Sequence, residues 1–196
     1  MAAATLPGVI LAAGAGTRFG MPKALARSAS GEPWLHLAAA ALRAGGAGPI
    51  LAVLGAEAEA ARRLLPEGVS AVVADDWADG VGASLAAGLA ALEGSPEIEE
   101  APAAVVTLVD LPGLPSTAVR RLIAAAGGRA ADRSALLQAT YAGRPGHPVV
   151  LGRAHWAPLR GTLDGDTGAR PYLLTHGVTA IECGDLWSGE DVDRAR

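Results

Sequence analysis

Several residue types are scarce in this chain of 196 residues, and each scarcity excludes something. There is one cysteine, Cys183, so neither an intramolecular disulfide nor a cysteine-rich zinc site can form. Aromatic residues make up 4% of the sequence, and no apolar run is long enough to cross a membrane. Residues 1–6 lack the positive charge that opens a secretory signal. We therefore expect a soluble, cytoplasmic protein that does not associate with membranes.

Basic residues are also few, and lysine is almost absent. The formal net charge is −4, which argues against binding of nucleic acid through a basic surface. Lys23 is the only lysine in the sequence, and every other strong cation is arginine. A single lysine among arginines indicates a requirement for a compact ammonium group at that position, such as contact with a chain of phosphates.

Apolar runs typical of buried strands alternate with helical segments along the chain. Helices are expected at 34–44, 57–65, 81–92 and 116–126, and two more are expected to begin near Arg153 and Gly168. Strands are expected from Val9 onward and at 49–54, 69–74, 103–109, 136–141, 148–151 and 178–183. This alternation predicts a single α/β domain over residues 1–196, with a mostly parallel central sheet flanked by helices.

The first apolar run leads directly into a glycine-rich loop that carries two cations. Gly14, Gly16 and Gly20 allow backbone N–H groups to approach an anion, and Arg18 and Lys23 add positive charge. The spacing fits neither common phosphate loop, because three residues separate Gly16 from Gly20 and the Gly-Lys-Ser/Thr ending is missing. The alternative is an ordinary turn between a strand and a helix with incidental cations.

Acidic side chains are expected at the same edge of the sheet as this loop. Ligands of open α/β sheets bind beyond the carboxyl ends of the strands. Asp75 and Asp76 follow the third strand, and Asp110 closes the fourth and opens an Asp-Leu-Pro connection. A carboxylate at that edge suits Mg²⁺, which prefers oxygen ligands and bridges phosphates. An aspartate is equally typical of a turn.

Small residues follow Trp77 at intervals that place them along one face of a helix. These residues are Gly80, Ser84 and Gly88, each four positions from the next. They would let a ligand approach the helix backbone closely. Alternatively, they would let the helix pack tightly on the sheet.

A later segment combines a histidine, two carboxylates and an arginine. His147 precedes Pro148, and the run Asp164-Gly165-Asp166 is followed by Arg170. Asp166 is a candidate metal ligand, or else the N-cap of the helix expected near Gly168. Alternatively, His147 is a histidine of the core or of a turn, and Arg170 forms an ion pair with an acidic neighbour.

Together these motifs resemble the MobA-like NTP transferase family, and in particular its molybdenum cofactor cytidylyltransferases. The resemblance runs from Gly8 to about Arg170 and is strongest in the loop L-A-A-G-x-G-x-R-x-G-x-P-K-x-L at residues 11–25. It implies the Rossmann-type α/β fold of the nucleotide-diphospho-sugar transferases. The family often closes on Asp-x-Asp-Thr-Pro-x-Asp-Leu, whereas here Asp193 is followed by Arg194. The last helix is therefore expected to be short or absent.

The resemblance implies transfer of CMP from CTP to the phosphate of molybdenum-bound molybdopterin, with release of pyrophosphate. Its substrates would be a nucleoside triphosphate and the molybdenum cofactor, and its cofactor would be Mg²⁺. A molybdoenzyme is a possible recipient of the product. By position, Arg18 and Lys23 would be catalytic, His147 and Arg170 would bind the acceptor, and Asp110 and Asp166 would hold the metal. The nucleotide would contact Leu11, Ala12, Ala13, Gly14, Gly16, Gly20, Lys23, Trp77, Gly80 and Ser84.

Ala13 points to CTP through the same resemblance, because the guanylyl branch of the family has glycine at this position. Two alternatives remain open, the first within the same class of function and the second in a different class. One is nucleotidyl transfer with GTP, or to a sugar phosphate or phospholactate. The other is a family member recruited as a non-catalytic nucleotide binder or as an oxidoreductase for small heteroaromatic molecules. The sequence offers no flavin or nicotinamide motif for the last role.

Overall fold

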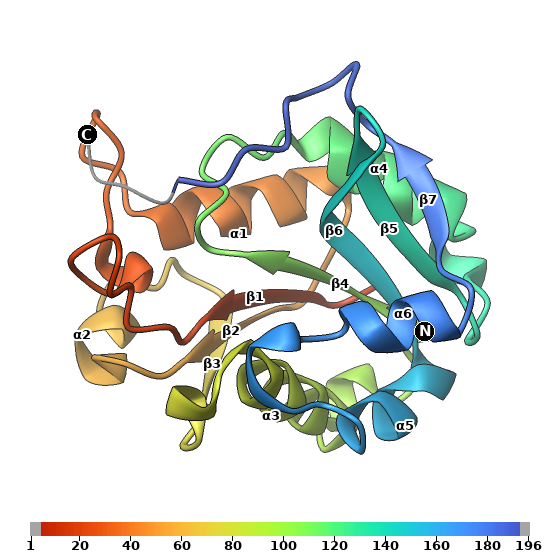
Figure 1. Ribbon diagram of the computed structural model, residues 1–196, viewed down its shortest axis with the longest axis horizontal. Coiled ribbons are helices and arrows are strands. Elements are labelled where there is room, and N and C mark those ends of the chain that lie inside the picture. Colours follow the sequence, from red (N-terminus) through yellow and green to blue (C-terminus); the bar gives the residue numbers. More distant parts are fainter. Residues whose placement is uncertain (1–4, 193–196) are drawn as a thin grey trace.

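A seven-stranded sheet runs through the part of the chain that the computed structural model describes, residues 5–192 (Figure 1). The strand order is β3-β2-β1-β4-β6-β5-β7. Only β6 runs against its neighbours, since it pairs antiparallel with both β4 and β5 and all the other pairs are parallel. The strands are β1 Gly8–Ala12, β2 Ile50–Leu54, β3 Val69–Val73, β4 Ala103–Leu108, β5 Leu136–Tyr141, β6 Arg144–Gly152 and β7 Thr179–Glu182. The predicted α/β fold with a mostly parallel sheet is confirmed.

Helices cover both faces of this sheet and form one core on each side (Figure 1). Successive residues of a strand point to opposite faces. Ile10 of β1 therefore packs on one side with Leu42, and Val9 packs on the other with Leu89. The helices of the first side are α1 Trp34–Gly45, α2 Ala58–Arg62 and α4 Ser116–Ala125, and those of the second are α3 Val81–Glu93, α5 Trp156–Arg160 and α6 Arg170–Thr175. No helix within residues 5–192 is long and apolar enough to cross a membrane.

Two elements differ in length from the prediction by more than two residues. The second helix is shorter than expected, because α2 ends at Arg62. The strand expected at 148–151 is longer, because β6 begins at Arg144. A tight turn with positive φ at Ala142 and Gly143 joins β5 to β6 and pairs the polar start of β6 with the end of β5. Polar residues at Arg144–His147 hid this pairing from the hydrophobicity pattern.

Glu182, the last residue of β7, holds the turn between β5 and β6. Its carboxylate accepts hydrogen bonds from Thr140 Oγ1 at 2.8 Å and from the N–H groups of Ala142 at 2.9 Å, Gly143 at 3.2 Å and Gly184 at 2.8 Å. Bonds to a carboxylate favour its charged form. The bond from Thr140 and then those from the backbone lower the pKa of Glu182 to about 2.

The segment after β7 returns across the edge of the sheet and contains no helix up to residue 192. The Trp187 ring meets the Tyr141 ring edge to face, with 5.4 Å between the centroids. The Val192 N–H donates a 3.1 Å hydrogen bond to the carbonyl oxygen of Asp110. The expectation of a short or absent last helix holds as far as residue 192, and Asp193 and Arg194 lie outside the described residues.

Candidate functional site

A cleft of about 690 Å³ lies at the carboxyl ends of β1 and β4. Its volume falls within the range of roughly 300–1,000 Å³ that is typical of small-molecule sites. Four segments line it: the loop after β1, the start of α3, the end of β4 and the turn before α6. The predicted residues along its walls are Leu11, Ala12, Ala13, Gly14, Gly16, Arg18, Lys23, Trp77, Gly80, Ser84, Asp110 and Asp166. Asp75 and Asp76 are not among the lining residues.

The loop after β1 offers a run of backbone donors to the cleft. Residues 14–18 all line it, and within residues 5–192 their N–H groups donate no backbone hydrogen bond. The N–H groups of Phe19 and Gly20 instead donate to the carbonyl of Gly16, at 2.9 and 2.8 Å. The predicted phosphate cradle therefore ends at Arg18. Gly20 belongs to the turn that closes the loop, and it does not line the cleft.

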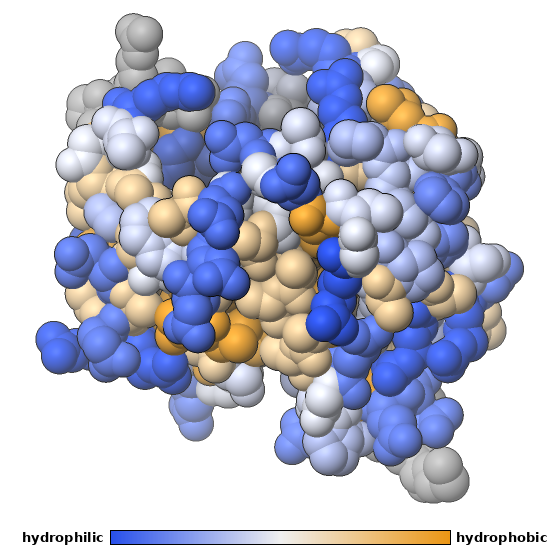
Figure 2. All heavy atoms as spheres, turned by 60° about the horizontal axis from the view of Figure 1, so that its bottom comes forward, coloured by the Kyte–Doolittle hydropathy of each residue, from blue (hydrophilic) through white to orange (hydrophobic). Residues whose placement is uncertain are grey.

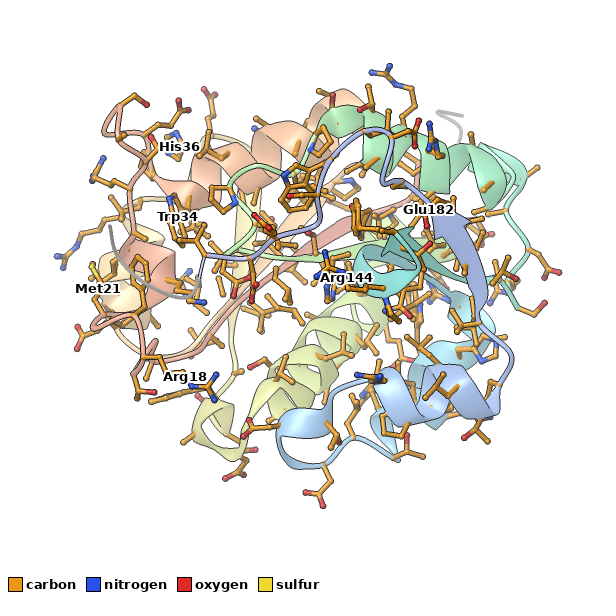
Figure 3. All side chains as sticks on the ribbon, turned by 45° about the horizontal axis from the view of Figure 1, so that its top comes forward. Arg18, Met21, Trp34, His36, Arg144 and Glu182 are labelled. Atoms are coloured by element: carbon orange, nitrogen blue, oxygen red, sulfur yellow. The ribbon has the colours of Figure 1, made fainter. Side chains whose placement is uncertain are left out.

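The conformation of this loop depends on one glycine and one aromatic contact. Gly16 has φ +61°, and a Cβ there would overlap the carbonyl oxygen of Met21. The Phe19 ring packs against Trp34 of α1, with 5.2 Å between the centroids. Figure 3 shows Arg18 and Met21 at the left of the molecule, away from Arg144 and Glu182, which lie nearer the centre of the view. The loop is thus anchored to α1 while its donors stay at the cleft.

Lys23 and Asp110 form an ion pair in the wall of the cleft. The Lys23 Nζ donates a 2.9 Å hydrogen bond to Asp110 Oδ2, and both side chains are largely buried. Asp110 Oδ1 is buried without a hydrogen-bond partner among the described residues. Burial raises the pKa of Asp110 above its usual value, and the bond from Lys23 offsets part of that increase. Both residues were predicted from the sequence, but their contact was not.

Gly80 is the point at which the start of α3 meets the turn before α6. It has φ +117°, and a Cβ there would lie 2.6 Å from both Asp166 Oδ1 and the carbonyl oxygen of Gly165. This close approach brings Asp166 to the cleft. The alternative of a capping role for Asp166 is not observed, because α6 begins at Arg170 after Ala169 and has no side-chain cap.

The remaining small residues of α3 divide between the two roles considered for them. Ser84 is buried and lines the cleft. Gly88 does not line it, and a Cβ at this position would lie 2.9 Å from Val53 Cγ2 on the sheet. Gly88 therefore serves close packing of the helix on the sheet, whereas Gly80 and Ser84 face the cleft.

A second pocket, of about 200 Å³, adjoins the cleft and shares Leu11, Val81 and Leu108 with it. His147 and Arg170 line this pocket, so the two predicted acceptor residues lie together but apart from the glycine-rich loop. Burial lowers the pKa of His147 to about 4, so its imidazole is uncharged at neutral pH. Figure 2 shows the face of the molecule that includes α3, α5 and α6, on which apolar atoms gather between polar side chains.

Gln138 of β5 also lines the second pocket and was not predicted from the sequence. The only indication of Gln138 in the sequence is that its amide interrupts the apolar residues of Leu136-Leu137-Gln138-Ala139. An unbranched polar residue within a buried strand is uncommon unless it has a partner.

The carboxylates of the cleft suit a divalent cation of the kind that keeps water and phosphate ligands. Within residues 5–192, no group of three or more His, Cys, Asp or Glu side chains is placed to hold a metal by itself. Asp110 and Asp166 both line the cleft, and the buried Oδ1 of Asp110 has no partner in that part of the chain. Mg²⁺ is commonly bound by one or two carboxylates together with substrate phosphates and water. The donor set therefore fits such an ion.

A glycine-rich loop that offers backbone donors at the carboxyl edge of a mostly parallel sheet, with a lysine–carboxylate pair beside it, is typical of an α/β enzyme that handles nucleotides. The chain belongs to the MobA-like NTP transferase family, whose model matches residues 8–180. The chain is accordingly a nucleotidyltransferase by family.

Individual relatives extend the similarity over nearly the whole chain. Nicotine blue oxidoreductase from Paenarthrobacter nicotinovorans is 38% identical over 192 residues, which cover 95% of this chain and 91% of the relative. The crystal structure of Rv0371c from Mycobacterium tuberculosis H37Rv is 28% identical with a TM-score of 0.76, covering 98% of this chain and 94% of its own. A complex of Rv0371C with manganese is 27% identical with a TM-score of 0.71, covering 91% and 88%.

Proposed function

We propose that this chain transfers CMP from CTP to the phosphate of molybdenum-bound molybdopterin, with Mg²⁺ as its cofactor. The observation that carries the proposal is the arrangement of the Lys23–Asp110 pair. It lies in a cleft that is large enough for a nucleotide and that opens into a second, largely apolar pocket. Such a pair of connected cavities suits a triphosphate on one side and an acceptor on the other.

In the proposed reaction, an oxygen of the acceptor phosphate attacks the α-phosphorus of CTP. A new P–O bond forms, the bond between the α-phosphorus and the bridging oxygen breaks, and pyrophosphate leaves with the electron pair. Catalysis of this kind depends on positioning and on stabilising negative charge. The N–H groups of residues 14–18 hold the β- and γ-phosphates, and Arg18 and Lys23 offset the charge that develops on pyrophosphate.

The carboxylates have a separate part in this scheme. Asp110 and Asp166 would hold Mg²⁺, which when bound supplies positive charge to the phosphate oxygens. Lys23 meets Asp110 directly, so the cation of the loop and the metal ligand are held in a fixed relationship. Supporting the assignment of a divalent cation, the Rv0371C relative has a structure in complex with manganese.

The choice of CTP rests on Ala13, which is buried in the cleft wall. Its methyl group would occupy space that a two-ring purine needs and a one-ring pyrimidine leaves free. The acceptor would lie in the second pocket, with Arg170 at its phosphate and His147 beside its ring. A molybdoenzyme would then receive the product.

Pyrophosphate release with each of the four NTPs, with and without molybdopterin, tests the proposal. We expect release only with CTP and molybdopterin together, in the presence of Mg²⁺. The Lys23→Ala variant provides the control for contaminating activity. Release with GTP instead, or with a sugar phosphate or phospholactate as acceptor, would keep the reaction class and replace the substrates.

A second candidate is the oxidoreductase role, which is favoured by the 38% identity to nicotine blue oxidoreductase. The glycine-rich loop lacks the dinucleotide spacing, so this role would require another mode of cofactor binding. Oxidation of NADH or NADPH in the presence of nicotine blue measures it directly. Consumption of either cofactor, without pyrophosphate release from any NTP, would establish this role and reject the first.

A further inference from the structure

Gln138 stands in an unusual position for an amide side chain. It lies in β5, between β6 and β7, where it pairs with Val149 on one side and Ala180 on the other. Leu136, two residues earlier, points to the core beneath α3 and α5, so Gln138 points to the same side of the sheet. There its side chain reaches the second pocket.

The other walls of this pocket are mostly aliphatic. They consist of Leu11, Val81, Leu85, Val106, Leu108, Val149, Leu151 and Leu173, with a turn of small residues that leads to Arg170. A volume of about 200 Å³ is below the usual size of a complete ligand site, roughly 300–1,000 Å³. The pocket therefore takes one part of a ligand, while the rest extends into the adjoining cleft past Leu11 and Leu108.

Gln138 is held in place but retains hydrogen-bonding capacity. Its Nε2 donates a 3.3 Å bond to the carbonyl of Gly146, which is long for a bond of this type. This is its one side-chain hydrogen bond within residues 5–192. An amide offers two donors and an acceptor with two lone pairs, so an N–H and the oxygen remain for a ligand.

His147 completes the polar part of the pocket. The bond from Gln138 reaches the residue just before it, and the carbonyl of His147 accepts a 2.6 Å bond from Tyr141 Oη. These two contacts fix the backbone on both sides of the imidazole. The imidazole is uncharged at neutral pH, so it offers one donor and one acceptor and no positive charge.

We propose that Gln138 determines acceptor specificity: together with His147 it binds the polar edge of a flat, uncharged heteroaromatic ring seated in the second pocket. The proposal rests on the proposed function, in which this pocket receives the acceptor. A side-chain amide pairs well with a ring edge that carries a neighbouring donor and acceptor, as it does with nucleobases. The aliphatic walls cover the two faces of such a ring.

The same lining disfavours a sugar as the occupant. A sugar carries hydroxyl groups around its whole circumference, and each one buried against an aliphatic wall loses its hydrogen bonds to water. Gln138 and His147 lie on the sheet side of the pocket and satisfy one edge of a ligand only. A flat ring with one polar edge matches this distribution.

Calorimetric titration of the full chain with pterin, a ring without phosphate or nucleotide, tests the inference. We expect pterin to bind the wild type more tightly than glucose 1-phosphate, and Gln138→Leu and Gln138→Met each to weaken pterin binding roughly tenfold or more. Leu136→Met is the matched control, on the same strand and face but outside the pocket, and should leave the affinity for pterin unchanged. CTP binding should be equal in all four proteins.

The outcomes separate this inference from the proposed function. Unchanged pterin affinity in both Gln138 variants overturns the inference, as does tighter binding of glucose 1-phosphate or no binding of pterin to the wild type. If pterin binding depends on Gln138 and no NTP yields pyrophosphate, the inference stands and the proposed function fails. If Gln138→Leu transfers CMP with the acceptor KM of the wild type, the proposed function stands and the inference fails.

Discussion

Lys23 Nζ lies 2.9 Å from Asp110 Oδ2, a contact that joins the loop after β1 to the end of β4 across 87 residues of sequence. The side chains are 15% and 18% exposed, so water screens their interaction only in part. The contact exists because β1 and β4 are neighbours in the sheet. It couples the lysine of the glycine-rich loop to the candidate metal ligand, and the first two predictions follow from it.

Replacement of the only lysine should impair turnover far more than folding. In Lys23→Ala, we expect kcat to fall about 10²–10³-fold, since comparable transition-state charge contacts are worth ~2.7–4 kcal/mol. The free energy of unfolding should fall by about 1–3 kcal/mol, because a buried carboxylate oxygen of Asp110 loses its donor. Lys23→Arg should also be impaired, since a planar fork does not replace a compact ammonium. Near-normal turnover by folded Lys23→Ala would contradict a catalytic role.

Asp110→Asn should lose metal-dependent activity and keep its stability. Burial raises the pKa of Asp110 above 3.8, so the folded state holds this proton to higher pH than the unfolded state does. The carboxyl group's contribution to stability therefore falls as pH rises through its folded pKa, and the full penalty persists at neutral pH. The neutral amide should unfold at an equal or higher temperature, while kcat falls roughly a hundredfold or more.

Thermal unfolding and Mg²⁺ titration of activity together check this prediction. Asp166→Asn serves as the comparison and should show a smaller or equal loss of activity, because Asp166 is exposed and Asp110 is not. An unchanged response to Mg²⁺ in Asp110→Asn would assign this aspartate to the turn alone.

Gly80→Ala should disrupt the cleft where α3 meets the turn before α6. The added methyl group would lie 2.6 Å from Asp166 Oδ1 and from the Gly165 carbonyl, at a φ of +117° that alanine rarely adopts. Gly94→Ala is the matched control at the other end of α3, where φ is −82° and the nearest atom would lie 3.5 Å away. We expect loss of activity in the first variant and normal activity in the second. Equal activities would show that the approach of Asp166 to Gly80 is dispensable.

Ala13→Gly should raise the use of GTP without abolishing that of CTP. One methyl group separates substrates by only ~1–3 kcal/mol, so the preference shifts and does not reverse completely. The measurement is kcat/KM for both nucleotides on the wild type and the variant. A wild-type preference for GTP would reject the CTP assignment, whereas an unaltered ratio in the variant would reject the steric explanation only.

Glu182→Gln should remove part of the acid sensitivity of the fold. Its hydrogen bonds lower the pKa of Glu182 to about 2 in the folded protein, against an ordinary value of 4.5, so its contribution to stability is complete above pH 4.5. That contribution is lost as pH falls from 4.5 toward 2, where the folded state too takes up the proton. Between these pH values, the midpoint temperature of thermal unfolding should fall less steeply with pH in Glu182→Gln than in the wild type. Parallel curves would mean that the four hydrogen bonds contribute little.

The sequence predicted the central strands β1, β2 and β4 well because they are largely buried on both faces and read as continuous apolar runs. It failed at the start of β6, where no apolar run marks the strand. The start of β6 is polar, yet it forms a strand because the turn at Ala142 and Gly143 places it beside β5. The pattern could not show this, since only a local turn conformation decides it.

The candidate site shows the same division. Individual positions such as Asp110 and Gly80 were predicted, because their spacing follows a local motif. The contact of Lys23 with Asp110 and the approach of Gly80 to Asp166 were not, because both depend on the order of strands in the sheet. Gln138 gave almost no signal, since a single amide in an apolar strand acquires meaning only from the pocket beside it.

The hydrogen bond from Val192 N–H to the Asp110 carbonyl bears on how the protein is made. The carbonyl of Asp110 is bound by a residue that is synthesised 82 positions after Asp110. At ~5–20 residues per second, roughly 4–16 seconds pass between the two. During that interval the end of β4 is exposed, and Trp187 has yet to cover Gly113 and Tyr141. A nascent chain stalled before residue 187 would present this apolar edge to chaperones, although its glycine-rich loop had long been complete.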